Sequence, residues 1–270
     1  MYKEKIKVIC KSLKVYKIVK YIYNIIISFY KKLQYIFLYL NFINDFYKFK
    51  YMMKTSQLRF NLLWKNRYPC VYDKTYTTEF NRHYVYHTSW AARIIAQIKP
   101  EFHIDISSSL YFCGIVSAFI PVRFYDYRPA DLKLSNLFSA SADLLDLFFD
   151  NESVASLSCM HTVEHIGLGR YGDPLDPDGD LKAIEELKRV IKVGGNLLFV
   201  VPIGRPKLMF NGHRIYSYSQ IISYFSGFNL HEFAFIPDNP SDGGLIINAT
   251  ENMANTQNDG CGCFWFVKSH

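Results

Sequence analysis

The sequence lacks the cysteine patterns that are typical of disulfide frameworks and zinc-binding motifs. Its 270 residues contain six scattered cysteines and no C-x-x-C pair. A disulfide framework needs a higher density of cysteine, and a zinc ribbon needs paired cysteines at short spacing. We therefore interpret Cys261 and Cys263, which flank a single glycine, as structural thiols. The same absence favours a reducing compartment, and we expect a cytoplasmic protein.

Long apolar runs are also absent. Two uncharged runs near the N-terminus, Tyr21–Tyr30 and Leu33–Asn44, are separated by Lys31 and Lys32. Each run is shorter than the roughly 20 apolar residues that a transmembrane helix needs. A small-residue cleavage site does not follow the runs, so a signal peptide is not indicated.

Acidic residues are scarce in one segment. Residues 1–54 hold twelve lysines against Glu4 and Asp45, a charge of +10, whereas the whole chain carries +7. The other 216 residues therefore sum to −3, which gives no reason to expect duplex nucleic acid as a ligand. We predict a basic N-terminal extension over residues 1–54 and one domain over residues 55–270.

The extension has several interpretations. Lysines interleaved with aromatic residues on a helix suit an interfacial anchor on an anionic membrane surface, here the inner face of the membrane. A helical hairpin packed on the body or on a second subunit explains the same residues. A codon bias of an AT-rich genome explains the composition without any function. The oligomeric state is not predicted.

What the sequence does contain is an α/β unit over residues 185–202. Leu187, Val190 and Ile191 follow i, i+3, i+4 spacing on one helical face, and the charged residues between them face water. Gly194 and Gly195 are expected to close the helix with a positive φ. The apolar run after them suits a strand that is covered on both faces, as in a parallel sheet.

Helix and strand patterns alternate over the rest of the chain from about residue 75. We expect helices over 88–98, 180–192 and 217–225, and a further helix that follows a small-residue turn at 107–109 and runs through residue 120. We expect strands over 102–106, 122–125, 154–158, 196–201, 230–236 and 263–267. Alternation of this kind predicts a doubly wound sheet. The last two strands are joined by a loop, which indicates that the last strand is antiparallel.

These features resemble class I S-adenosylmethionine (SAM) dependent methyltransferases. The run from Glu164 to Asp173, together with Asn211–Arg214, is more specific and looks like the DUF268 family, a methyltransferase-like group. The resemblance covers roughly residues 70–270 and is most specific at 161–214. It implies a Rossmann-like sheet of seven strands with an antiparallel last strand, and SAM as the cofactor of a methyl transfer.

The resemblance also implies cofactor-binding residues. Asp105, Ser107 and Ser109 occupy the first motif, an acidic residue and a small-residue turn, with serine where the family has glycine. Because serine resists a positive φ, we expect this turn to differ from the usual one. A serine-rich helix N-cap without a ligand is the alternative.

Two further acids match cofactor positions. Asp126 follows the second strand, where the family places a carboxylate against the ribose hydroxyls, a diol that one carboxylate can bind through two hydrogen bonds. An ion pair of Asp126 with Arg123 or Arg128 is the alternative. Asp143 matches the position that accepts a hydrogen bond from the adenine amino group, with Asp146 and Asp150 as competitors nearby.

His161, Glu164 and His165 spell H-x-x-E-H and have two interpretations. On a continuous helix the histidines would bind zinc with the glutamate as base, which makes a zinc hydrolase our third hypothesis. Gly167 cuts such a helix short, so we assign no metal ligand. In the preferred interpretation the segment is the loop after the fourth strand, where many small-molecule methyltransferases carry a Glu-His pair. His161 or His165 is then the candidate base and Glu164 its orienter.

Basic residues near the same sheet edge complete the predicted site. Arg170, Arg205, His213 and Arg214 would hold an anionic acceptor such as a phosphorylated or nucleotide-linked sugar. A solvated basic loop is the alternative. The second hypothesis for the whole chain is a methyltransferase-like domain that has lost the cofactor and serves as a binding or scaffold protein.

Overall fold

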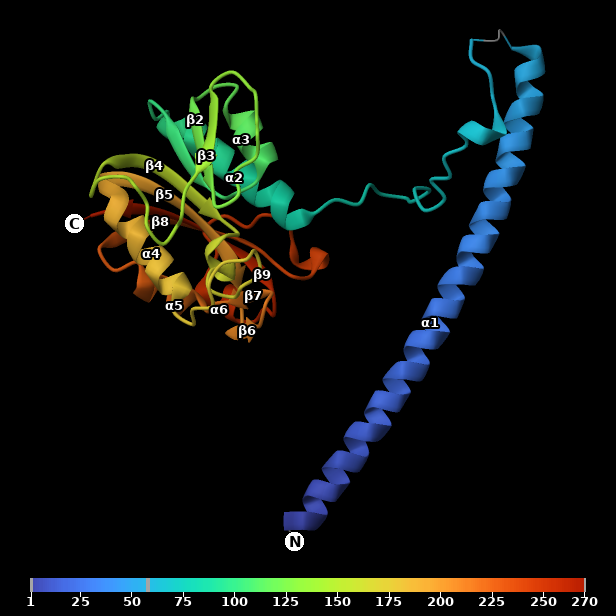
Figure 1. The fold of residues 1–270 in the computed structure, drawn as a ribbon, viewed down its shortest axis with the longest axis horizontal. Coiled ribbons are helices and arrows are strands. Elements are labelled where there is room, and N and C mark those ends of the chain that lie inside the picture. Colours follow the sequence, from blue (N-terminus) through green and yellow to red (C-terminus); the bar gives the residue numbers. More distant parts are fainter. Residues whose placement is uncertain (1, 57–58, 270) are drawn as a thin grey trace. The chain divides into compact units, whose positions relative to one another are not determined.

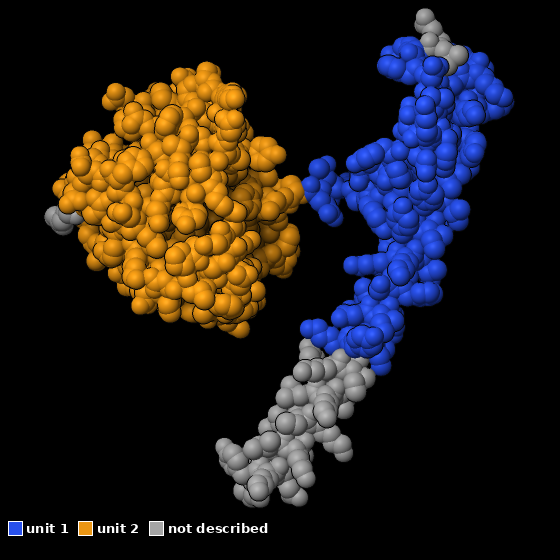
Figure 2. All heavy atoms as spheres, in the orientation of Figure 1, with its two compact units in different colours: residues 1–79 blue, residues 80–270 orange. Residues whose placement is uncertain are grey.

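The computed structural model describes residues 2–56 and 59–269, with side chains described from residue 19 onward. The side chains of residues 1–18 of the predicted basic extension therefore lie outside the described residues. The chain divides into two compact units, residues 1–79 and residues 80–270, which Figure 2 shows in two colours. This boundary falls later than the predicted one after residue 54.

The first unit is built on one long helix. Helix α1 spans Tyr2–Met52 and is followed by the short 3-10 helices η1 (Met53–Thr55) and η2 (Trp64–Asn66). The Trp64 ring packs edge-on against Phe46 with 4.8 Å between ring centroids, and Lys74 forms an ion pair with Asp45 at 2.8 Å. The two uncharged runs thus belong to one continuous helix and not to a hairpin. Among the residues that the structure describes, none of the helices combines the length and apolar composition needed to cross a membrane.

The second unit is a seven-stranded sheet with helices on both faces (Figure 1). The strand order is β3-β2-β1-β4-β5-β9-β8, in which the first five strands are parallel and β9 is antiparallel to both neighbours. The strands are β1 (His103–Ile106), β2 (Val122–Asp126), β3 (Leu137–Ser141), β4 (Val154–Met160), β5 (Ile191–Ile203), β8 (Phe228–Ile236) and β9 (Gly260–Lys268). This arrangement confirms the predicted fold class.

The connecting elements follow the predicted alternation. They are α2 (Arg82–Ile98), α3 (Leu110–Val116), η3 (Val163–His165), α4 (Gly179–Val190), the hairpin β6 (Lys207–Met209) and β7 (His213–Ile215), α5 (Tyr218–Tyr224), η4 (Pro240–Asp242) and α6 (Glu251–Asn255). Helix α5 begins at a capping box, because Ser217 accepts from the backbone of Gln220 and the Gln220 side chain accepts in return.

Two hydrophobic cores lie on the two faces of the sheet. One contains apolar residues of α4 and α5, such as Leu187 and Ile221, and the other contains those of α2 and α3, such as Trp90 and Phe112. Neighbouring residues of β5 alternate between them: Phe199 belongs to the first core and Leu198 to the second. The period of two in a strand thus supplies both cores, which is why β5 is apolar and buried from Leu197 to Ile203.

Three local predictions need correction. Helix α4 ends at Val190 and β5 begins at the next residue, so the glycine pair does not close the helix. Gly194 instead adopts a φ of 75° within β5, where the pairing with β4 changes register. Strand β3 was not among the expected strands because its residues alternate weakly. Helix α2 begins at Arg82, earlier than expected, with the Asn81 side chain as its cap.

Candidate functional site

The carboxyl ends of the parallel strands border two adjoining cavities of about 180 and 60 Å³. Ser107 after β1, Thr162 and His165 after β4, and Tyr171 in the next loop line both of them. Asp126 and His161 line the larger cavity, and Asp143 lines the smaller one. The topology therefore brings together Ser107 of the first motif, the two later acids and the histidine segment, as parallel strands with a shared carboxyl edge require.

The turn after β1 contradicts the expectation from its serines. Ser107 adopts a φ of 55°, the left-handed conformation for which glycine is the usual residue. Its N–H donates to the Tyr125 carbonyl oxygen at 2.7 Å, and its hydroxyl donates to the same oxygen at 3.3 Å. These bonds continue the β1 to β2 pairing past the strand end. The serine turn thus accepts the positive φ, at a cost of about 1 to 2 kcal/mol.

Asp105 supports this turn from inside the protein and does not line either cavity. Its carboxylate accepts from the Ser108 N–H at 3.0 Å and from the Ser158 hydroxyl. The side chain is fully buried, and burial outweighs these hydrogen bonds and raises the pKa of Asp105 to about 6. Ser158 also contacts His103 at 2.8 Å, whose pKa burial lowers to about 3.

Ser109 lies away from the other predicted cofactor residues. It is the N-cap residue of α3, without a hydrogen bond from its side chain to the helix backbone. It lines a separate groove between α2 and α3, which is bordered by apolar side chains such as Val85, Leu110 and Ile115. The structure therefore brings Ser107, and not Ser109, to the cavities.

Asp126 and Asp143 each stand at the start of a turn. The Asp126 carboxylate accepts from the Arg128 N–H at 2.7 Å, and the Asp143 carboxylate accepts from the Leu145 N–H at 2.9 Å. These bonds are local, to the backbone two residues on, and they fix each side chain beside its cavity. The alternative partner of Asp126, Arg128, uses its guanidinium over the Tyr171 ring, 4.7 Å from the centroid.

The H-x-x-E-H segment is not a helix of the zinc-protease type. Only Val163–His165 form a turn of 3-10 helix, and His161 precedes it with a φ of 55°. Glu164 is 1% exposed, and one of its oxygens lies 2.9 Å from His161 Nδ1 and 3.8 Å from His165 Nε2. Because a carboxylate can only accept, His161 carries its proton on Nδ1.

The proton of His165 is also fixed by its partner. Its Nδ1 lies 2.7 Å from the Gly212 carbonyl oxygen, which can only accept, so Nε2 keeps a lone pair. Burial lowers the pKa of His165, although Glu164 opposes this effect. A histidine that is neutral near pH 7, with a free lone pair and a place in the cavity wall, has the properties of a general base.

The glycine-rich loop after the histidines is organised by one aspartate. Asp173 accepts from the backbone N–H groups of Gly167, Gly169 and Tyr171 at 2.8, 3.3 and 3.1 Å. These hydrogen bonds outweigh desolvation and lower the pKa of Asp173. Gly167 has a φ of 79°, and a Cβ there would lie 2.0 Å from the Asp176 carbonyl oxygen. The sequence from residue 164 to 173 therefore encodes a fixed loop over the cavity.

The predicted acceptor-binding residues separate into two groups. Arg214 is buried and its guanidinium is used internally, since it donates to the Ile166 and Pro177 carbonyl oxygens and pairs with Asp180 at 3.3 Å. We therefore assign it to loop positioning. The other three side chains are accessible: Arg170 and Arg205 are exposed, and His213 is half-buried.

Sequence reasoning placed His83, Tyr84 and His87 in a possible lid over the cofactor or acceptor, and it did not predict that they surround His161. His83, Tyr84 and His87 of α2 surround its ring, with centroids 6.0, 5.7 and 5.0 Å away. From β9, Cys261 places its sulfur 3.4 Å from His161 Nε2. Burial lowers the pKa of His161, but the contacts with Cys261 and Glu164 outweigh burial and raise it above its usual value. The i, i+4 spacing of His83 and His87 was a usable signal, because it places both on one helix face.

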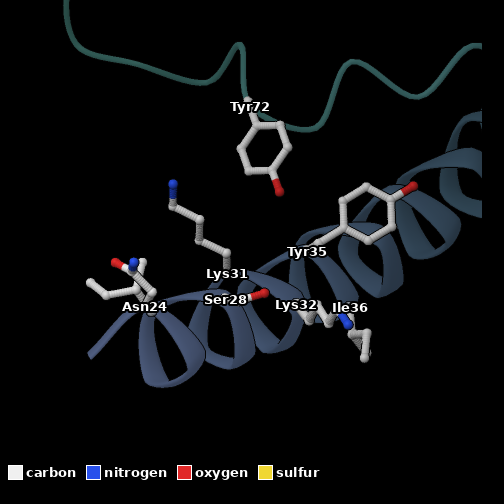
Figure 3. Close-up of a pocket in the computed structure, with 8 residues that line it drawn as sticks. Asn24, Ser28, Lys31, Lys32, Tyr35, Ile36 and Tyr72 are labelled. Atoms are coloured by element: carbon white, nitrogen blue, oxygen red, sulfur yellow. The ribbon is translucent and has the colours of Figure 1, made fainter. Parts of the chain in front are cut away.

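The first unit carries a groove of its own. It measures about 710 Å³ and lies along α1 beside the loop of Tyr72 (Figure 3). Lys31, Tyr35 and Tyr72 line it, and none of its lining residues is a predicted site residue. The cavities at the sheet edge are therefore the better candidate site.

Comparison with known protein families matches a part of the chain that includes the histidine segment. Residues 139–251 match the DUF268 family. Its description is "Caenorhabditis protein of unknown function", and the match confirms the resemblance seen in the sequence over a shorter range than expected. The DUF268 segment runs from β3 to α6 and includes the histidine segment and the glycine-rich loop. No curated protein sequence matches the chain.

Solved structures similar to this chain are methyltransferases and proteins of related fold. They include the N-methyltransferase NodS from Bradyrhizobium japonicum in complex with S-adenosyl-L-homocysteine (11% identity, 71% of this chain and 90% of that chain, TM-score 0.49). The methyltransferase in a complex with the Trm112 methyltransferase activator of Haloferax volcanii has 18% identity, 70% and 90% coverage and a TM-score of 0.47. The YcgJ protein from Bacillus subtilis has 12% identity, covers 67% of this chain and 99% of that chain, and has a TM-score of 0.46.

Proposed function

We propose that this protein transfers a methyl group from SAM to a small or glycan-related acceptor with an anionic group. The observation that carries the proposal is the meeting of Ser107, Asp126 and Asp143 with His165 around adjoining cavities at the carboxyl edge of the sheet. These residues come from four separate segments of the chain, and the family resemblance gives each of them a role at one ligand.

The residues around the cavities fit the parts of the cofactor. Asp126 supplies carboxylate acceptors for a ribose diol, and Asp143 supplies one for an amino group of adenine. The positive φ of Ser107 keeps the turn after β1 beside the cavity, while the buried Asp105 carboxylate stabilises that turn by accepting from the Ser108 N–H. When bound, SAM supplies an electrophilic methyl group, so the protein's own task is to position the acceptor and take its proton.

His165 is the proposed base. Its Nε2 carries no proton in the arrangement fixed by the Gly212 carbonyl, and its ring lines both cavities. Glu164 stands between the two histidines and orients His161 through the 2.9 Å contact. Arg170, Arg205 and His213 are the proposed contacts of an anionic acceptor, with Arg170 closest in sequence to the base.

A calorimetric titration with SAM and with S-adenosylhomocysteine tests the proposal. We expect micromolar affinity, and Asp126→Ala should weaken it at least tenfold, or about 1.4 kcal/mol. Asp131→Ala is the matched control, because Asp131 is an exposed acid in the loop after β2 and lines neither cavity. Equal loss in both variants would contradict the ribose role of Asp126.

The same titration distinguishes the methyltransferase from the second hypothesis, a cofactor-free binding or scaffold protein. A cofactor-free binding or scaffold domain should show neither heat nor a thermal shift at millimolar SAM. The fixed loop of Asp173 and the buried acid Asp105 are compatible with either function, since both stabilise the fold. Loss of all cofactor binding in the intact protein would therefore favour the scaffold.

For residues 1–54 we propose contact with an anionic membrane surface on the cytoplasmic side. Helix α1 exposes large apolar side chains such as Ile26, Phe29 and Phe37 alongside Lys31 and Lys32. The full chain should sediment with anionic liposomes, and high salt should release much of it, because salt screens the lysines. A chain shortened to residues 80–270 should stay in the supernatant and still bind SAM. Sedimentation of both proteins, or of neither, would contradict this role.

A further inference from the structure

Three metal-ligand side chains from distant segments meet beside the larger cavity. His83 comes from α2, His161 follows β4, and Cys261 lies in β9; each offers a ligand atom within 4.8 Å of the other two. The 3.4 Å between Cys261 Sγ and His161 Nε2 is close to the separation of two ligands in a tetrahedral zinc site, about 3.5 Å for bonds of 2.0 to 2.3 Å.

The hydrogen bonds around His161 prepare its Nε2 as a ligand. Its Nδ1–H donates to Glu164 Oε1 at 2.9 Å, so Nε2 is the nitrogen that faces the sulfur of Cys261 and that a metal would bind after losing any proton. In zinc sites a carboxylate commonly accepts a hydrogen bond from the histidine that binds the metal. This outer-shell carboxylate fixes the ring orientation and raises the basicity of the histidine. Glu164 is buried, and its other oxygen has no hydrogen-bond partner in the described part of the chain.

A further imidazole packs against this cluster. His87 is fully buried, and within the described residues neither of its ring nitrogens has a hydrogen-bond partner. It stands one helical turn after His83 and packs edge-on against the His161 ring, with 5.0 Å between centroids. A buried imidazole without hydrogen-bond partners is unfavourable, so this part of the core favours a bound ligand.

We propose that His83, His161 and Cys261 bind a zinc-type divalent ion. Two imidazole nitrogens and one thiolate are the donors of a borderline-soft ion and unlike those of Mg²⁺ or Ca²⁺. This site differs from the H-x-x-E-H arrangement weighed from the sequence, since His165 uses Nδ1 on Gly212 and Glu164 acts from the outer shell. It also departs from the prediction that the chain holds no metal, and it does not depend on methyl transfer.

Metal analysis of the intact, tag-free protein tests the site. After dialysis with Zn²⁺ and removal of the excess, we expect about one zinc ion per chain in the original protein and less than a tenth of that in Cys261→Ser and His83→Gln. Cys263→Ser is the matched control, because Cys263 lies two residues along β9 and is equally buried, and it should keep its zinc. Cobalt in place of zinc should give a thiolate charge-transfer band that Cys261→Ser lacks.

Two results would overturn the proposal. One is an original protein that holds no zinc or cobalt after loading; the other is equal metal content in the original protein, Cys261→Ser and His83→Gln. Because His83 is only half-buried, His83→Gln keeps the test decisive where the cysteine variant fails to fold, with circular dichroism as the check. Glu164→Gln sharpens the result, since loss of the outer-shell carboxylate should weaken zinc affinity 10- to 100-fold while the ligands remain.

Discussion

The two units of the chain use apolar side chains in opposite ways. In the sheet unit Phe199 and Phe264 are 0% exposed, whereas on α1 Phe29 and Phe37 are 63% and 64% exposed. Both segments are rich in aromatic residues, so composition does not separate them. The difference lies in pattern. Strand residues alternate between two cores that helices distant in sequence cover, whereas most of the apolar side chains described on α1, from residue 19 onward, are exposed within unit 1.

The largest expected effect tests this contrast directly. Phe199→Ala should lower the free energy of unfolding by about 3 to 5 kcal/mol, because it removes a fully buried ring that packs 4.8 Å from Phe225. Phe37→Ala should change it by less than about 0.5 kcal/mol. Urea unfolding of the full chain, followed by near-ultraviolet circular dichroism, measures both. A large effect of Phe37→Ala would show that α1 contributes to the folded core.

The next effect concerns pH and Asp105. Its folded pKa is raised from 3.8 to about 6, so between these values the folded protein keeps a proton that the unfolded chain releases. The stability that this proton contributes is present below pH 4 and is lost as pH rises through 6, by roughly 3 kcal/mol. Asp105→Asn should remove this loss, and unfolding measured from pH 4 to 7 should give a flatter profile.

Asp131→Asn is the control for the pH profile. Asp131 is 85% exposed, so its replacement should leave the profile of the original protein unchanged. Parallel profiles for Asp105→Asn and the original protein would contradict the raised pKa. They would indicate that the hydrogen bonds from Ser108 and Ser158 compensate the burial of the charge.

Much of the fold could be predicted from the sequence, because many of its helices and strands are determined by local sequence patterns. The apolar run around Phe199 and the capping residue Ser217 determine their own elements, and their order along the chain predicts the sheet. The weakly patterned strand β3 was missed, since four of its five residues are exposed or partly exposed. The conformation of Ser107 was predicted wrongly because the β1 to β2 hydrogen bonds, and not residue preference, fix its φ.

In the candidate site, too, local sequence position could be predicted, whereas contacts made by tertiary packing could not. Asp126 and His165 could be predicted at this sheet edge because each comes at the end of a strand pattern or shortly after one. His83 and Cys261 were missed as partners of His161, since only the packing of α2 and β9 against the end of β4 brings them together. Arg214 looked like a ligand contact from sequence, and its role inside the protein depends on two carbonyl groups that the sequence does not reveal.

A medium effect should come from the loop over the cavity. Asp173→Ala leaves three backbone N–H groups without their acceptor and should lower the free energy of unfolding by about 1 to 3 kcal/mol. Asp178→Ala is the control, because that exposed acid precedes α4 without capping it through its side chain. Thermal unfolding measures both. If the two variants unfold together, the glycine-rich loop is held by contacts other than Asp173.

The smallest effect concerns the strain at Ser107. Glycine adopts a φ of 55° at no steric cost, whereas alanine keeps the cost and lacks the hydroxyl that reaches Tyr125. We therefore expect Ser107→Gly to be more stable than Ser107→Ala by up to about 1 kcal/mol, and close to the original protein. Chemical denaturation of the two variants resolves this difference when they are measured side by side. Equal stability would show that the turn relaxes to a negative φ once the hydroxyl is lost. In that case the serine side chain, together with the backbone bond to Tyr125, holds the conformation that brings this turn to the cavity.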